Sequence, residues 1–530
     1  MAREAAIDAV IVGGGHNGLV AANILADAGW RTLVVEAADR LGGAVHSDES
    51  LRTGFVTDWF SSFYPLAAAS PVLRRLDLPR WGLRWTHAPA VLAHVFPDDR
   101  CAVLSRDLDV TAASLDAFAP GDGAAWVELV RRFELIKEPL LDAVLGPFPP
   151  LRAAGRLART LGVADLLRFA RFAVQPVRRF GEETFDGEGG PMLFAGNALH
   201  TDLAPEAAGS AIYGWLLSML AQTDGFPVPV GGSGAIVDAL VARLKAAGGA
   251  VRLNAEVASI DVADHRTTGV TLASGERIEA TSVLADVGAP ALYQDLVGAS
   301  HLPERLLRDL KAFQWDAATL KVNWALSGPI PWTAAGARGA GTVHLGTDLD
   351  GLTRYATSLT TGQLPAKPFL LLGQMTTADA TRSPAGTESA WAYTHVPDGL
   401  TLTAAASARQ VARIEAAVER HAPGFGELVL ARAVQTPADL HAADLNLFAG
   451  AVGGGTAAIH QELFFRPVPG LGRAETPIDG LYLASASAHP GGGVHGAPGS
   501  NAALAALRRH GRTGRLHRAA IDAAYRRIYR

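Results

Sequence analysis

One glycine-rich segment near the start of the chain constrains the fold more than any other feature. Residues 8–12 form a short apolar, β-branched run, and the sequence GGGHNG follows at 13–18. An alanine-rich stretch comes next at 19–29, and a second apolar run at 31–36 ends in an acid. Strand, glycine turn, helix, strand and acid at this spacing predict the first βαβ unit of a dinucleotide-binding domain.

Each glycine of this motif has a physical reason. Gly13 permits the tight turn, Gly15 lets the backbone approach a pyrophosphate, and Gly18 lets the helix pack closely on the strand. The start of the helix, at His16 and Asn17, directs free N–H groups and the positive end of the helix dipole towards phosphate. These positions are therefore expected to bind a cofactor.

The acid and the residues after it separate FAD from other dinucleotides. Glu36, followed by Ala37, is placed to accept hydrogen bonds from a ribose, and its charge disfavours the 2′-phosphate of NADP. The next segment is similar to the arginine and double-glycine element of many FAD oxidoreductases, which approaches the pyrophosphate and ribityl chain. Its expected contact residues are Arg40, Gly42, Gly43 and Ala44. The alternative is a surface turn that uses glycine for backbone freedom.

A second glycine-rich loop lies near the end of the chain. We expect a strand at 479–486, a loop with five glycines between 491 and 499, and a helix at 502–507. A helix start beside the flavin pyrimidine ring would stabilise negative charge there, and glycines would let the backbone approach the ring. The expected contacts are Ser485, Gly493, Val494 and His495. His489 and His495 either lie near the isoalloxazine ring, where His495 is a candidate catalytic residue, or hydrogen-bond the loop backbone.

These motifs together resemble the phytoene dehydrogenase-like family of flavoproteins, which includes carotenoid desaturases and isomerases. Within that family the chain is similar to the branch of pyridine nucleotide-disulfide oxidoreductase domain-containing protein 2. The resemblance covers nearly the whole chain, through the segments 10–22, 200–211, 225–240, 391–397, 464–470 and 488–503.

The resemblance implies an α/β fold with a composite, Rossmann-type FAD-binding domain and a mixed α+β substrate domain. The FAD domain would comprise 1–60, 225–300 and 460–507, the substrate domain 61–224 and 301–459, and a basic tail 508–530. It also implies that the strand holding Val257 contacts the adenine side of FAD through its backbone. Where many relatives carry an acid for the ribityl hydroxyls, this chain has Ser485-Ala486.

Two candidate catalytic positions lie in the expected substrate domain. Lys321, in a strand-like run at 318–326, is similar to the amine-oxidase lysine that reaches flavin N5 through water, where a cation would favour electron transfer to oxygen. The alternative is a lysine on a strand edge facing solvent. Trp391, Tyr393 and His395 alternate and so share one face of a strand. That face would line a substrate cavity with His395 as polar anchor, or it would be ordinary core packing.

Composition excludes several classes of function. The chain has 530 residues, 52 acidic against 47 basic side chains and a net charge of −5, which argues against a nucleic-acid partner. Cys101 is the only cysteine, so a disulfide reductase with a thiol pair is excluded and a reducing, cytoplasmic location is expected. A second complete unit of strand, GxGxxG, helix and acid for NAD is also absent from the sequence. Met1–Ala6 has no signal-peptide pattern, and no apolar run reaches about 18 residues.

Two segments combine arginine with apolar residues. Residues 151–180 contain seven arginines against one acid, and 508–530 is similarly basic. A basic amphipathic helix can lie on an anionic membrane, so peripheral membrane contact is one interpretation. A solvated helix face or an oligomer contact is the other, and the oligomeric state is left open.

The sequence therefore predicts an FAD-dependent oxidoreductase that dehydrogenates, or desaturates, a C–C bond of an apolar, carotenoid-like substrate by hydride transfer to flavin N5. Three alternatives stay open: an amine or C–N oxidase of natural-product biosynthesis, a redox-neutral isomerase, and a non-catalytic flavin-binding partner protein. Oxygen or a quinone is the expected electron acceptor, because no NAD site is evident.

Overall fold

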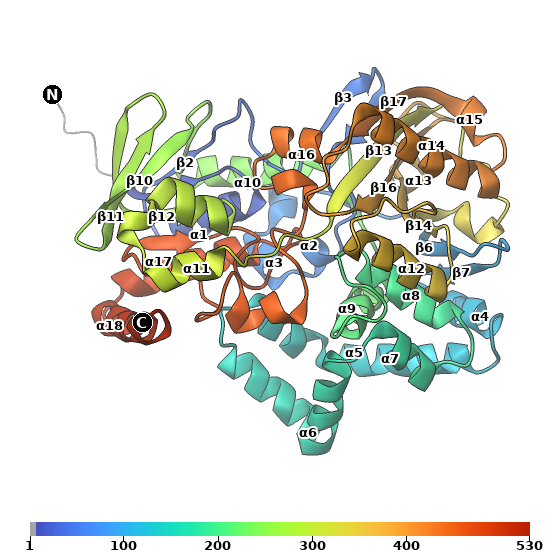
Figure 1. The fold of residues 1–530 in the computed structure, drawn as a ribbon, viewed down its shortest axis with the longest axis horizontal. Helices are drawn as coiled ribbons and strands as arrows, with labels where there is room; N and C mark the ends of the chain where they lie inside the picture. Colours follow the sequence, from blue (N-terminus) through green and yellow to red (C-terminus); the bar gives the residue numbers. More distant parts are fainter. Residues whose placement is uncertain (1–6) are drawn as a thin grey trace.

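The computed structural model describes residues 7–530, so the expectation for Met1–Ala6 lies outside the described part of the chain. Figure 1 shows two sheet-based lobes side by side, with a group of helices below the second lobe. The first lobe holds β1, β2 and β10–β12, and the second holds β6, β7 and β13–β17.

The first lobe is built on a seven-stranded sheet with the order β10-β11-β12-β1-β2-β9, and β18 also pairs with β12. β1 is parallel to β12 and to β2, and β18 is parallel to β12, as a dinucleotide-binding sheet requires. The strands are β1 (Ile7–Val12), β2 (Thr32–Val35), β9 (Ala250–Arg252), β10 (Val257–Ala263), β11 (Arg266–Leu272), β12 (Arg277–Ala285) and β18 (Leu481–Leu483).

These strands come from three separate parts of the chain, and all three lie within the ranges expected for the FAD domain. Short turns at 264–265 and 273–276 connect β10 to β11 and β11 to β12. Asp264 and His265 have positive φ angles of 50° and 58°, which a tight reversal of this kind uses. Helices α1 (His16–Asp27), α10 (Gly234–Ala246) and α17 (Ala497–His510) pack on the sheet around one apolar core.

The second lobe is built on a seven-stranded sheet with the order β17-β13-β16-β15-β14-β6-β7. Its strands are β6 (Ala90–Val95), β7 (Cys101–Leu104), β13 (Ala318–Leu326), β14 (Ala340–Leu345), β15 (Leu370–Gln374), β16 (Glu388–Val396) and β17 (Val429–Gln435). Every residue of β13 is buried, because β16 and β17 flank it on both sides. Two hairpin-like pairs complete the strands: β3 (Ser47–Arg52) with β4 (Phe55–Asp58), and β5 (Trp85–Thr86) with β8 (Val228–Pro229).

The remaining helices pack against one of the two lobes or form the helical group beneath the second lobe. They are α2 (Pro65–Ala69), α3 (Pro71–Leu76), α4 (Leu108–Asp116), α5 (Asp122–Leu145), α6 (Leu151–Ala173), α7 (Val177–Thr184), α8 (Gly189–Ala198), α9 (Ser210–Thr223), α11 (Glu304–Leu310), α12 (Leu349–Thr360), α13 (Met375–Ala378), α14 (Ala404–His421), α15 (Phe425–Leu428), α16 (Pro437–Ala443) and α18 (Gly514–Ile528). Short helical turns lie between them at 78–81, 291–297, 299–301, 335–337, 448–450, 459–461 and 463–465. None of the helices within residues 7–530 has the length and apolar character needed to cross a membrane.

Two boundaries near the C-terminus differ from the sequence prediction. The strand expected at 479–486 covers only 481–483, because the chain leaves the sheet after Ala484 donates to the Ala285 carbonyl oxygen at 2.8 Å. The helix expected at 502–507 begins five residues earlier, with Pro498 in its first turn, and continues to His510. Proline suits that position because its missing N–H has no partner in a first turn.

The basic C-terminal segment is folded rather than extended. It contains the end of α17 and all of α18. Arg509 and Arg518 both pair with Asp479, and Arg518 also pairs with Asp522. The charges of these two arginines are therefore neutralised within the protein.

Candidate functional site

The first glycine turn is organised by the acid that ends β2. The backbone N–H of Gly14 donates to Glu36 Oε2 at 2.7 Å, and the N–H of Ala38 donates to Oε1 at 2.9 Å. A Cβ at Gly18 would collide with the Gly13 carbonyl oxygen, and a Cβ at Gly14 would collide with Leu41. Glycine is thus required by close backbone approach, as the motif predicts.

The double-glycine segment lies directly on this turn. Gly42 donates to the Gly14 carbonyl oxygen at 2.9 Å and forms a parallel bridge with Gly15. Gly42 is buried, with φ at 117°, so the segment is not a free surface turn. The Arg40 side chain, in contrast, is half exposed and pairs only with Asp39, at 3.7 Å. Ala44 accepts a hydrogen bond from Ser61 Oγ through its carbonyl oxygen.

A buried acid at this turn was missed by the sequence reasoning. Asp286 follows β12, and its Oδ2 accepts from the Gly18 N–H at 2.8 Å. Burial, together with the nearby Asp444 and Glu36 carboxylates, raises its pKa to about 8. At neutral pH the Asp286 carboxyl is mostly protonated, so it can lie near a phosphate without repelling it. The available signal was an acid directly after a strand-like run, the same pattern that identified Glu36.

Two helix N-termini meet where the cofactor is expected. A Cβ at Gly499, in the first turn of α17, would collide with the backbone of Asn17 in α1, and His16 Nε2 lies 3.3 Å from the Gly493 carbonyl oxygen. Asn17 Oδ1 is buried without a hydrogen-bond partner among the described residues. A buried polar atom of this kind is satisfied by a ligand that carries donors. The free backbone N–H groups at the two helix N-termini and the closely packed glycines beside them therefore fit FAD, with phosphates at α1 and the flavin at α17.

The remaining expected FAD contacts lie at the two edges of this region. Asn254 and Ala255 donate to the carbonyl oxygens of Ala38 and Glu36 at 2.9 and 2.8 Å, which places the start of β10, at Val257, beside the ribose acid. Ser485 lies just beyond β18, is buried, and its Oγ accepts from the Ser487 N–H at 3.3 Å. The predicted contacts of Val257 and Ser485 with FAD stay predictions.

The two loop histidines behave differently. His495 uses both ring nitrogens on the loop backbone, because Nδ1 accepts from the Ala497 N–H at 3.1 Å and Nε2 donates to the Gly492 carbonyl oxygen at 3.3 Å. Burial lowers its pKa to about 3, so the ring is neutral and shapes the loop. His489 is also buried, with its pKa lowered to about 4, yet neither ring nitrogen has a hydrogen-bond partner among residues 7–530.

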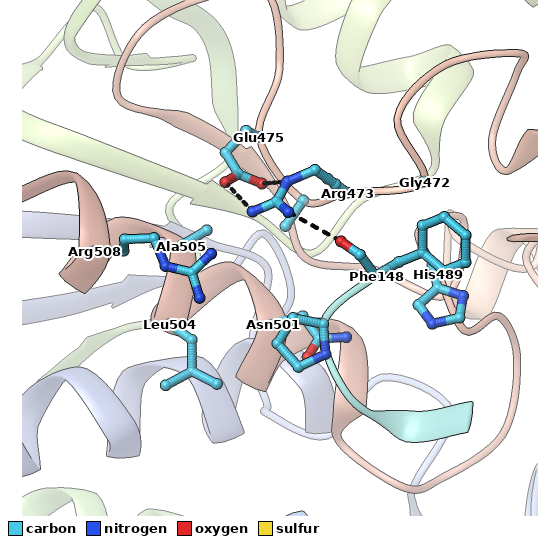
Figure 2. Close-up of a pocket in the computed structure, with 11 residues that line it drawn as sticks. Phe148, Gly472, Arg473, Glu475, His489, Asn501, Leu504, Ala505 and Arg508 are labelled. Carbon is cyan, nitrogen blue, oxygen red and sulfur yellow. Dashed lines mark hydrogen bonds and ion pairs between the residues drawn. The ribbon is translucent and has the colours of Figure 1, made fainter. Parts of the chain in front are cut away.

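His489 faces a small pocket on the outer side of α17. Figure 2 shows it, with the Arg473–Glu475 ion pair above and Asn501 and Leu504 of α17 beside it. Its lining is Pro147, Phe148, Gly472, Arg473, Ala474, Glu475, His489, Asn501, Leu504, Ala505 and Arg508. Arg473 Nη1 donates to the Phe148 carbonyl oxygen at 3.0 Å, so the ion pair closes the pocket rather than facing into it.

Lys321 is buried at the junction of the two lobes. Its Nζ donates to the carbonyl oxygens of Asp58 and Phe60 at 2.5 and 3.0 Å and lies 5.3 Å from the centre of the Trp391 ring. The side chain is 3% exposed and β13 is an interior strand, which rules out the alternative of a solvent-facing strand edge. Burial and the nearby Arg382 lower its pKa to about 7, against the opposing effect of Asp58.

One face of the second sheet carries the aromatic row expected from the sequence. Lys321 and Tyr393 are direct cross-strand partners, and Trp391 and Tyr393 stack at 5.9 Å between ring centres. His395 Nε2 donates to the Leu199 carbonyl oxygen at 2.9 Å, while its buried Nδ1 has no partner within the described chain. The row therefore runs from the amine of Lys321 to His395, whose Nδ1 is available to accept a hydrogen bond.

Apolar side chains pack around the Trp391 end of this row. Ala88, Val228, Met375 and Ala378 form a small buried cluster with Trp391, and Phe63 and Tyr393 pack against that cluster. Phe63 lies 6.1 Å from the Trp391 ring, between centres. The surroundings of Trp391, next to Lys321, are thus mainly apolar.

Comparison with known proteins agrees with this geometry. The sequence profile of the family described as "Flavin containing amine oxidoreductase" matches residues 18–390. The chain belongs to this family. It is an FAD-dependent oxidoreductase with an α/β fold, and it is similar to members of the phytoene desaturase-like branch.

Two relatives match along nearly their whole length. Pyridine nucleotide-disulfide oxidoreductase domain-containing protein 2 of Mus musculus is 28% identical, over 94% of this chain and 93% of its own. A lycopene-forming phytoene desaturase of a Paracoccus species is 26% identical, over 94% and 97%. Among solved structures, cyclohexylamine oxidase from Brevibacterium oxydans shares the fold, with a TM-score of 0.57, 17% identity, and coverage of 96% of this chain and 100% of its own.

Glu36→Gln tests the ribose end of the site. Glutamine places an NH2 group against one of the two backbone N–H groups that Glu36 now accepts, and it weakens acceptance from ribose hydroxyls. We expect FAD to bind roughly 10- to 100-fold more weakly, since a hydrogen bond to a charged group contributes about 1.5–3 kcal/mol. Flavin fluorescence titration of the apoprotein measures this.

The matched control is Glu49→Gln. Glu49 also accepts a backbone N–H, from Gly54 at 2.7 Å, but in the exposed turn between β3 and β4. Equal FAD affinity of the Glu36 variant and the wild type would contradict the assignment.

Proposed function

We propose that this oxidoreductase dehydrogenates a C–C bond of an apolar, isoprenoid- or carotenoid-like substrate. The observation that carries the proposal is the apolar and aromatic packing around Trp391, next to Lys321, which suits a substrate without charge. The 26% identical relative that is named a phytoene desaturase supports it, because that match extends over both chains.

The chain's own residues would bind and orient the substrate. When bound, FAD supplies the acceptor for the hydride at flavin N5, and oxygen or a quinone is the proposed final electron acceptor. Phe63, Trp391 and Tyr393 would hold the substrate over the flavin and exclude water. His395 would anchor a polar group through its unused Nδ1. FAD itself would be held by the residues around the two glycine loops, including Glu36, Asn17 and Gly42.

Anaerobic mixing of the oxidised holoenzyme with candidate polyenes tests the reaction. We expect the flavin absorbance to bleach and the product mass to fall by two hydrogens. An unchanged product mass would favour the redox-neutral isomerase instead. If amines bleach the flavin absorbance and polyenes do not, the reaction is amine oxidation and the proposal is wrong.

Amine or C–N bond oxidation is the second candidate. Two observations favour it: the family description names amine oxidoreductases, and Lys321 is buried on an interior strand, with Nζ 5.3 Å from the Trp391 ring centre. The product distinguishes the two reactions, since an oxidised amine hydrolyses to a carbonyl compound and a shorter amine.

Lys321→Met tests the role of the lysine in either reaction. We expect reoxidation of the dithionite-reduced holoenzyme by oxygen to slow at least about tenfold, because the variant removes the only charge that β13 brings to this site. Flavin reduction by substrate is expected to change far less. Rapid-mixing absorbance of the flavin follows both steps.

Lys245→Met, on the exposed last turn of α10, is the matched control and is expected to leave both rates unchanged. If Lys321→Met slows flavin reduction and flavin reoxidation equally, the lysine has no specific role in the reaction with oxygen.

We also propose that the protein is cytoplasmic and lies peripherally on anionic membranes through α6. This helix extends away from the body of the molecule in Figure 1. Leu151, Val163 and Leu167 are 76%, 79% and 68% exposed. Arg152 and Arg159 make no ion pair among the described residues, whereas Arg156, Arg168 and Arg171 are paired with Asp142, Asp165 and Glu183. Exposed apolar residues beside free arginine are the pattern of an interfacial helix.

Flotation with phosphatidylglycerol-containing vesicles tests this proposal. The wild type is expected to float at low salt, and a triple variant with Leu151→Asp, Val163→Asp and Leu167→Asp is expected to stay in the dense fraction. Leu445→Asp, at an equally exposed leucine (67%) in a loop, is the control and should float. Failure of the wild type to float at any salt concentration would leave α6 as a solvated face or an oligomer contact.

The domain division stays part of the same proposal. Residues 1–60, 225–300 and 460–507 would bind FAD, and 61–224 and 301–459 would bind the substrate. The two sheets are drawn from these same ranges, which supports the division.

A further inference from the structure

A fully buried group of three charged side chains lies beneath the backbone that Lys321 contacts. Arg382 is 0% exposed, in the turn after α13. Its Nη2 donates to Asp58 Oδ2 at 2.7 Å, and its Nε donates to Asp379 Oδ2 at 3.2 Å. We call these residues the Asp58–Arg382–Asp379 triad. Buried charge is costly, and nothing in the proposed reaction contacts the triad, so its position calls for an explanation.

The triad connects segments that belong to different lobes. Asp58 Oδ1 accepts from the Ser233 N–H at 2.9 Å, and Asp379 Oδ2 accepts from the Gly231 N–H at 2.8 Å. The Arg382 carbonyl oxygen accepts from the Val56 N–H at 2.8 Å. The triad therefore holds the turn at 58–60, whose two carbonyl oxygens receive the Lys321 amine.

This arrangement leaves one position on the Lys321 nitrogen free. Two of its hydrogens are held by the carbonyl oxygens of Asp58 and Phe60. In the ammonium form the third position is an N–H donor, and in the amine form it is a lone pair. The charge state of Lys321 thus decides whether it offers a proton or accepts one at the site.

Few other charges act on this amine. The flanking strands place Tyr393 and Gln435 opposite Lys321, and burial raises the pKa of Tyr393, so both are neutral. Tyr64, which lies near Asp58, is also neutral because burial raises its pKa. Asp58 raises the pKa of Lys321 and Arg382 lowers it, whereas Asp379 has no resolved effect on it.

We propose that Asp58 and Arg382 are positioning residues that set the protonation state of Lys321 with opposite sign. Arg382 weakens proton binding by Lys321 and Asp58 strengthens it. Burial of Lys321 disfavours its charged form most, and these two opposed charges adjust that effect, so Lys321 is an exchangeable proton carrier instead of a permanent cation. The inference rests on the proposed place of Lys321 beside the flavin.

The test is a pH titration of the oxidised holoenzyme, read from the flavin absorbance spectrum without turnover. A charge that appears or disappears beside the flavin perturbs that spectrum. We expect the wild type to show a transition with a midpoint near 7, in line with the pKa of Lys321 of about 7, and Lys321→Met to lack it.

Asp58→Asn and Arg382→Met should move the midpoint in opposite directions. Asp58→Asn removes the attractive charge and should lower the midpoint by about one unit, whereas Arg382→Met should raise it by about one unit. Arg382→Lys keeps the charge and should restore a midpoint close to that of the wild type. Asp379→Asn is the matched control, because it removes a second buried carboxylate from the same arginine without acting on Lys321.

The outcomes separate this inference from the proposed function. No transition in the wild type, or a transition unaffected by Lys321→Met, overturns the placement of Lys321 and this inference with it. A transition that depends on Lys321 but shifts equally in Asp58→Asn and Asp379→Asn shows that the triad is only structural, and overturns this inference alone. If Arg382→Met does not retain flavin, the two asparagine variants decide the question, since they preserve side-chain shape.

Discussion

The close approach of backbone to backbone at the glycine turn is the constraint on which the first lobe depends. Gly18 lies against the Gly13 carbonyl oxygen, and Gly499 lies against the backbone of Asn17, so no side chain fits at either contact. These two contacts bring the N-termini of α1 and α17 together. A site between two helix N-termini carries positive potential from both, which suits a cofactor with a pyrophosphate and an electron-accepting ring.

The acidic side chains around this positive region are either hydrogen-bonded to backbone N–H groups or withdrawn from water. Glu36 is held by two backbone N–H groups. Asp286 is buried and Asp444 is partly buried, and desolvation raises the pKa of both. A protonated carboxyl can donate a hydrogen bond to phosphate oxygen, whereas an ionised one would repel it. The acidic side chains are therefore compatible with a dianionic pyrophosphate, although the sequence alone shows only their negative charge.

Local patterns predicted the first lobe well, and contacts between distant segments explain what they missed. The βαβ unit at 7–36 follows from apolar runs and turn residues, and so does the strand of Lys321 in the second lobe. The early start of α17 was missed, because five glycines suggested a loop where Pro498 begins a helix. Asp58 and Arg382 are 324 positions apart, and neither belongs to a recognisable motif. Their pairing depends on how the lobes pack, which a single sequence does not encode locally.

The two loop histidines show the same limit within one short segment. The sequence left both open between a flavin contact and a backbone contact. His495 uses both nitrogens on neighbouring backbone groups, while His489 uses neither. The difference comes from Phe148, Asn501 and the ion pair of Arg473, which enclose His489 from other parts of the chain.

At the junction between the lobes, the packing of the lobes affects the protonation of Lys321 directly. Lys321 belongs to the second sheet, yet its amine is held by carbonyl oxygens at 58–60, which follow β4 and are fixed by the triad. A change in how the lobes pack would therefore alter the position and the proton affinity of the same nitrogen. Because Arg382 and Asp58 are withdrawn from water, their charges act on Lys321 with little screening. Packing of the two lobes and the protonation of one amine thus depend on the same buried ion pair.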